Sequence, residues 1–104
     1  MILEAELVVT NNTFLRQYES EIDSNLVAIE YSIQAKNIYL SKLKFPDSDS
    51  IEKLEEAKNQ FIYTVLKEIK DSDLYRVVPT SKEIIKFFRK NRQFKSLLPA
   101  GIRI

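Results

Sequence analysis

A long apolar stripe at helical spacing, set between two stretches with the pattern of strands, constrains the fold more than any other feature. The stripe lies in residues 51–70 and consists of Leu54, Ala57, Phe61, Ile62, Val65, Leu66 and Ile69. Its spacing is typical of an amphipathic helix that packs on a sheet. Strands are expected at residues 38–45 and 74–79. A strand–helix–strand order predicts a right-handed crossover that leaves the two strands parallel.

The residues before this helix predict an antiparallel meander of three strands over residues 14–45. In the first strand, Phe14, Tyr18 and Ile22 fall on one face. Residues 23–25 have hairpin chemistry, because Asp and Asn tolerate the left-handed backbone conformation. A short extended segment over residues 6–10 is expected ahead of the meander, with a turn at residues 11–12.

A second helix is expected over residues 81–92, because Ile84, Phe87 and Phe88 recur at helical spacing. Thr80 and Glu83 have the spacing of a capping box at its start. The first helix is expected to be capped by Asp49 with Glu52, or by Ser50 alone, and the tail to add an edge strand or cover the core. The sequence therefore predicts a mixed α+β fold in a single domain, residues 1–104: meander, helix, parallel strand, helix and C-terminal tail.

Several residue types that enzymes commonly use are missing. The chain has no Cys and no His, which excludes thiolate catalysis, a Ser–His–acid triad and the usual zinc sites, so no metal is expected. A single glycine excludes the glycine-rich phosphate loops. No apolar run approaches the length of a membrane span, and acids stand near the N-terminus where a signal peptide needs basic residues. A cytoplasmic location without a membrane partner is therefore expected.

Charge is unevenly distributed along the chain. Residues 1–75 hold 8 Lys and Arg against 14 Asp and Glu, whereas residues 76–104 hold 8 against 1. Basic residues interleave with phenylalanines there, as in some nucleic-acid-binding surfaces: Lys82, Lys86, Arg89, Lys90, Arg92 and Lys95. Buried aromatic side chains beneath solvated cations give the same pattern. This second interpretation weighs against nucleic acid as the partner.

The stretch Val77, Val78, Pro79, Thr80 and Ser81 resembles the closing motif of the GNAT superfamily, the CoA-dependent N-acetyltransferases. In the small single-domain branch of that family, the strand ends Val-Val-Pro-x-Cys and a helix follows. Ser81 stands at the cysteine position, and residues 91–94 stand at the family's His-Pro-Glu-Tyr-like turn. The resemblance extends over about residues 8–98. It implies a GNAT-like fold and acetyl transfer to an amine of a small molecule or a protein.

The resemblance also implies a site. Acetyl-CoA would lie along the strand over residues 38–45 and at the start of the first helix, and the catalytic position would be Ser81. The cofactor-binding positions would be Leu43, Lys44, Phe45, Lys53 and Lys58.

Two departures from the family pattern weigh against this activity. The phosphate loop lacks its glycines and carries Glu55 and Glu56, whose charge opposes a pyrophosphate. A serine hydroxyl is not ionised by a helix dipole alone, and no histidine is available as its base. The sequence thus predicts an acetyltransferase-like protein with a degenerate site. The alternative is a non-catalytic binding module that uses the basic C-terminal surface for an anionic partner such as nucleic acid.

Overall fold

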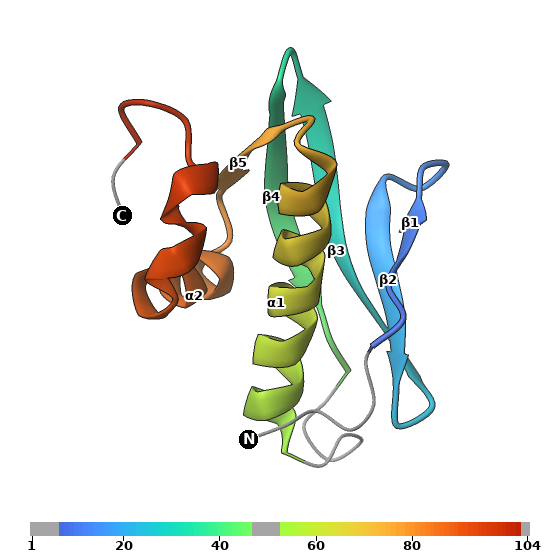
Figure 1. Cartoon of the computed structure of the whole chain (residues 1–104). Helices are drawn as coiled ribbons and strands as arrows, with labels where there is room; N and C mark the ends of the chain where they lie inside the picture. Colours follow the sequence, from blue (N-terminus) through green and yellow to red (C-terminus); the bar gives the residue numbers. More distant parts are fainter. Residues whose placement is uncertain (1–6, 47–52, 103–104) are drawn as a thin grey trace.

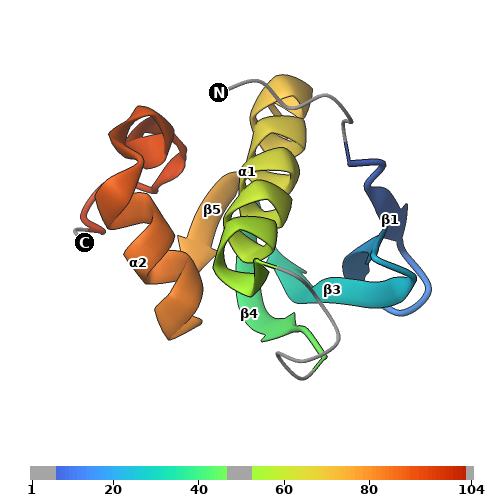
Figure 2. The same cartoon turned by 90° about the horizontal axis from the view of Figure 1, so that it is seen from below.

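A computed structural model describes residues 7–46 and 53–102 and arranges them as one sheet with helices on one face (Figures 1 and 2). The first four strands precede the long helix. The elements are, in chain order, β1 (Thr10–Asn12), β2 (Gln17–Ile22), β3 (Asn25–Gln34), β4 (Asn37–Lys44), α1 (Leu54–Ser72), β5 (Arg76–Pro79), α2 (Lys82–Lys90) and the 3₁₀ helix η2 (Arg92–Leu97).

The sheet has the order β1-β2-β3-β4-β5, so each strand pairs with its neighbours in sequence. The first four strands are antiparallel to one another, and β5 is parallel to β4, with Asn37 opposite Arg76 and Leu40 opposite Pro79. The predicted meander and the parallel return after the helix are both confirmed, and so is the α+β class. The meander has one more strand than expected, because β1 adds to its edge.

The turn between β2 and β3 follows the predicted chemistry. Asp23 and Ser24 have positive φ angles of 50° and 66°, as a two-residue hairpin turn requires. The Asn25 side-chain amide donates a hydrogen bond to the Asp23 carbonyl at 2.9 Å. In a chain whose one glycine is Gly101, Asp and Ser supply the left-handed conformation instead.

The first part of the chain differs from the prediction. Residues 7–9 form no strand, Asn11 and Asn12 belong to β1, and β2 begins only at Gln17. Phe14 lies in the turn and is 92% exposed. This turn closes because the Asn12 side-chain oxygen accepts a hydrogen bond from the Leu15 N–H at 3.0 Å. The spacing of Phe14 and Tyr18 fits one face of a continuous strand. Spacing alone could not show that Phe14 lies in a turn before β2.

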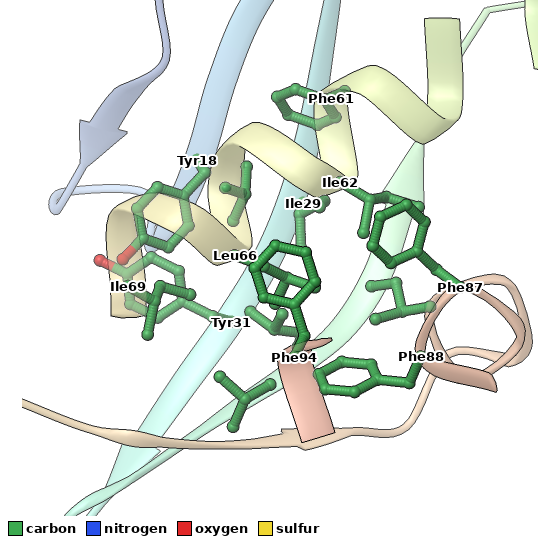
Figure 3. Close-up of a cluster of buried hydrophobic side chains, with 14 of the residues drawn as sticks. Tyr18, Ile29, Tyr31, Phe61, Ile62, Leu66, Ile69, Phe87, Phe88 and Phe94 are labelled. Carbon is green, nitrogen blue, oxygen red and sulfur yellow. The ribbon is translucent and has the colours of Figure 1, made fainter. Parts of the chain in front are cut away.

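The core lies between α1 and the sheet, with α2 and η2 closing one side (Figures 2 and 3). The predicted stripe of α1 is buried, apart from the partly buried Leu54. It meets Val27, Ile29 and Tyr31 of β3, which are buried and alternate along one face of the strand. Ile84, Phe87 and Phe88 complete the core from α2, as do Phe94 and Leu97 from η2. Leu97 and the partly buried Leu98 therefore cover the core, and residues 97–102 add no edge strand.

The predicted capping box of α2 is wrong. Ser81 is the N-cap residue, and its side chain makes no capping hydrogen bond. Thr80 instead extends the pairing with β4, because its N–H and its hydroxyl both donate to the Leu40 carbonyl, at 3.0 and 3.3 Å. Glu83 pairs with Lys58 of α1 at 2.9 Å rather than with the helix start. The capping residues proposed for the first helix lie outside the described residues.

The ends of the two helices have different caps. Asp73 follows α1 with a positive φ of 56°, and its N–H bonds to the carbonyls of Ile69 and Lys70. At the end of α2, the Asn91 side-chain amide donates to the Phe87 carbonyl at 2.9 Å. This helix therefore ends at Lys90, two residues earlier than expected, and the chain continues as η2.

Replacing Thr80 with Ala is expected to change the free energy of unfolding by less than about 0.5 kcal/mol. The hydroxyl makes one long hydrogen bond to a carbonyl and caps no helix. Urea denaturation measures this, with the core variant Ile84→Ala as a control that should lose about 2–5 kcal/mol. A loss near 1 kcal/mol for Thr80→Ala, the usual cost of a lost N-cap, would contradict the assignment.

A second prediction concerns Tyr18, whose ring packs 5.2 Å from that of Tyr31 between centroids. Burial, followed by the nearby Tyr31, Glu68 and Tyr75, raises the pKa of Tyr18 to about 12. The unfolded state ionises first, near pH 10, so the stability held below that pH should fall as pH rises from about 10 to about 12. Urea denaturation across this range should show a shallower decline for Tyr18→Phe. Identical profiles would count against the raised pKa.

Candidate anion-binding surface

Helix α2 divides its residues between the core and the solvent. Ile84, Phe87 and Phe88 are buried, while the cations of the helix face outward and are exposed: Lys82, Lys86, Arg89 and Lys90. Arg92 in η2 is also exposed, and Lys95 is half-buried. We call these six residues the α2 surface. The neighbouring aromatic rings belong to the core, since Phe87, Phe88 and Phe94 are at most 4% exposed.

Among the described residues, the cations of the α2 surface form no ion pair. Within residues 7–46 and 53–102, the ion pairs are Lys44–Glu30, Lys58–Glu83 and Lys67–Asp71. None of them includes a residue of the α2 surface. Glu83 is the one acid in residues 76–104, and its carboxylate is 2.9 Å from the Lys58 ammonium. The six cations of this surface therefore have no ion-pair partner in the part of the chain that the structure describes.

A groove of about 270 Å³ separates the start of α1 from α2. It opens where β4 and β5 part, because their pairing ends at Leu40 and Pro79 while β4 continues to Lys44. Its lining comes from three elements: Leu43 of β4, Glu55, Lys58, Asn59 and Ile62 of α1, and Glu83, Lys86, Phe87 and Lys90 of α2. The groove has an apolar floor and charged walls of both signs.

Two of the predicted cofactor-binding residues, Leu43 and Lys58, line this groove. Lys44 points elsewhere, because it alternates with Leu43 along the strand: its ammonium is 2.7 Å from Glu30 and 3.2 Å from the Gln17 side-chain oxygen. Phe45 packs on Phe61, with 5.8 Å between ring centroids. Lys53 precedes α1 and is exposed.

Ser81 lies at the strand–helix junction, but nothing there activates it. Its backbone is extended, with φ −79° and ψ 135°, and its carbonyl accepts the Ile85 N–H at 2.9 Å. No residue in the described part of the chain hydrogen-bonds its hydroxyl. The position therefore has the geometry of a helix cap without an adjacent general base.

The face of the sheet away from the helices carries a polar network that the sequence patterns did not indicate. Gln17 and Asn12 both donate to the Glu19 carboxylate, and Lys44 joins Gln17 to Glu30. The hydrogen bond from Lys44, and then its charge, lower the pKa of Glu30. Since these residues come from β1, β2, β3 and β4, the network ties the antiparallel strands together on the side away from the helices.

A second pocket, of about 460 Å³, lies at the end of the sheet where α1 gives way to β5. Its lining includes three cations that the sequence analysis did not single out, namely Lys36, Lys70 and Arg76. Lys70 lies in the last turn of α1 and Arg76 begins β5 six residues later, whereas Lys36 lies in the distant β3–β4 turn. Local sequence composition could not have predicted that these three cations line one pocket.

No group of three or more potential metal ligands forms within residues 7–46 and 53–102, and no helix there is long and apolar enough to cross a membrane. No protein-family model matches the sequence, and no curated protein matches it closely enough to indicate a relative.

Proposed function

We propose that this domain is a non-catalytic binding module that holds an anionic partner, such as nucleic acid, on the α2 surface. The observation that carries the proposal is the uncompensated charge of this surface: its cations lie on one side of α2 and on η2, and none has a carboxylate partner among the described residues. Buried aromatic side chains beneath these cations fix the helix, so the charged face is presented by a rigid element.

The lysines along α2 repel one another when no anionic partner is bound. Lys82, Lys86 and Lys90 follow one another at four-residue intervals, about 6 Å apart along the helix axis. Like charges at this spacing repel and destabilise a helix by about 0.2–0.5 kcal/mol per pair. A polyanion removes this repulsion and releases its own counterions on binding. The same row of charges that costs stability in the free domain thus favours the complex.

The chemistry of the surface also limits what it can distinguish. Contacts of lysine and arginine with phosphates carry no sequence information, and the phenylalanines that would stack on unpaired bases are buried in the core. We therefore expect binding through this surface to be mainly electrostatic and to depend little on base sequence.

The test compares two double variants of equal charge. Lys86→Gln with Arg89→Gln removes two cations of the α2 surface, and Lys42→Gln with Lys67→Gln removes two exposed cations elsewhere. In fluorescence titrations of duplex DNA at low salt, the first variant should bind more weakly, and its slope of log affinity against log salt should be shallower by about 1.8. The second should retain the wild-type slope.

Two results would oppose the proposal. Equal weakening in both double variants would show that net charge alone acts, rather than the α2 surface. Undetectable binding to DNA and to RNA at low ionic strength would leave the surface as an ordinary solvated helix face.

CoA-dependent acetyl transfer is the second candidate, and one observation favours it. The groove between α1 and α2 contains Leu43 and Lys58, two positions at which the family resemblance implies contact with the cofactor. Lys86 and Lys90 add positive charge to its wall. Against this, Glu55 and Glu83 line the same groove, and Lys58 is already paired with Glu83.

Calorimetric titration with acetyl-CoA separates the two candidates. The carboxylates in the groove should keep the dissociation constant of the wild-type protein above about 1 mM. Glu55→Gln should strengthen any binding that uses the groove, because it removes a like charge, whereas Glu21→Gln on the distant β2 should not. A micromolar complex with the wild-type protein would favour the acetyltransferase.

A further inference from the structure

The pocket at the end of α1 is assembled by the topology of the sheet. Because β5 runs parallel to β4, the α1–β5 connection reaches the end of the sheet where β3 turns into β4, as Figure 1 shows. The Arg76 N–H donates to the Lys36 carbonyl at 2.8 Å, which joins the two connections. The Arg76 guanidinium donates to the Ser96 carbonyl, which adds η2 as a third wall. The full lining is Lys36, Lys70, Asp73, Leu74, Tyr75, Arg76, Ser96 and Leu97.

The charges in this pocket are unbalanced. Three cations face one acid, Asp73, which leaves a net charge of +2. Within residues 7–46 and 53–102, no ion pair includes Lys36, Lys70 or Arg76. Lys70 rests 5.9 Å from the centroid of the Phe94 ring, a weaker interaction than an ion pair. Bringing three like charges to one concave site is unfavourable unless an anion joins them.

The polar groups of the pocket are mostly donors. A guanidinium has five N–H groups, and the hydrogen bond to Ser96 uses one group of Arg76. Tyr75 and Ser96 add hydroxyls to the lining. At the end of α1, the carbonyls of Ile69 and Lys70 already accept the Asp73 N–H. The pocket thus offers positive charge and hydrogen-bond donors to a single ligand.

We propose that this pocket binds the phosphomonoester group of a small organic phosphate. A phosphomonoester carries a charge close to −2 at neutral pH and accepts several hydrogen bonds, which matches the net charge and the donors of the site. A phosphodiester carries one negative charge and matches less well. Leu74, 64% exposed, and Leu97 supply apolar surface for the organic group. The volume lies in the range of small-molecule sites. This site does not depend on the α2 surface.

The binding test uses phenyl phosphate, with diethyl phosphate as the diester control and inorganic phosphate as the probe without an organic group. At pH 7.5, phenyl phosphate should bind saturably and shift the amide NMR signals of Lys36, Tyr75 and Arg76. It should bind more tightly than either control ligand. Failure of phenyl phosphate to saturate, or equal binding of the diester, would overturn the proposal. Equal binding of inorganic phosphate would overturn the role given to the organic group.

Affinity should also fall below about pH 6, where the ligand becomes a monoanion. The charged and titratable groups facing it are Lys36 from the β3–β4 turn, Lys70 and Asp73 from the end of α1, and Tyr75 and Arg76 at the start of β5. The expected change follows the second ionisation of the phosphomonoester. Affinity that stays constant between pH 7.5 and about pH 5 would contradict recognition of the dianion.

Side-chain replacements locate the site. Arg76→Gln and Lys70→Gln should each weaken phenyl phosphate binding by about tenfold, the effect of losing one charge-assisted hydrogen bond. Lys67→Gln is the matched control, because Lys67 is exposed on the preceding turn of α1 and pairs with Asp71 at 3.4 Å. Urea denaturation checks that each variant folds. A similar loss in Lys67→Gln would place the binding outside this pocket.

Discussion

The packing of α1 on the sheet is the interaction on which the other features depend. Its stripe buries Phe61, Val65 and Leu66 completely against strands on both sides of the crossover. Each such side chain contributes about 1.5–3 kcal/mol by leaving water, so this contact dominates the folding of a small domain. It also fixes the parallel return of β5 beside β4. The groove lies where α1 begins, and the pocket beside Arg76 lies where α1 ends.

The charge separation follows from the same core. The C-terminal third contributes its phenylalanines to the interior, and the positions left on the outside of α2 are almost all basic. Glu83, the one acid of that segment, faces α1 and pairs with Lys58. The helical period thus places the aromatic rings on the buried face of α2 and the cations on its exposed face.

Periodicity predicted the parts of the fold in which one face is buried. Ile29 and Phe61 sit where alternation and helical spacing place them. The predictions for Phe14 and Thr80 were wrong for a common reason. The hydrogen bond between Asn12 and Leu15 closes a turn, and the pairing of Thr80 with Leu40 is a tertiary contact. The spacing of residues in the sequence encodes neither of them. The cluster around Arg76 was missed because the parallel pairing of β4 with β5, rather than sequence proximity, brings Lys36 beside Arg76.

The two proposed sites differ in shape, and shape decides how each responds to salt. The α2 surface is exposed, so its attraction for an anion is screened over about 8 Å at physiological ionic strength. The pocket beside Arg76 is concave, and its donors can contact one phosphate directly from several sides. Direct charge-assisted hydrogen bonds are less sensitive to screening than attraction across solvent. The first site thus responds to the charge density of a partner, whereas the second responds to the geometry and charge of a single group.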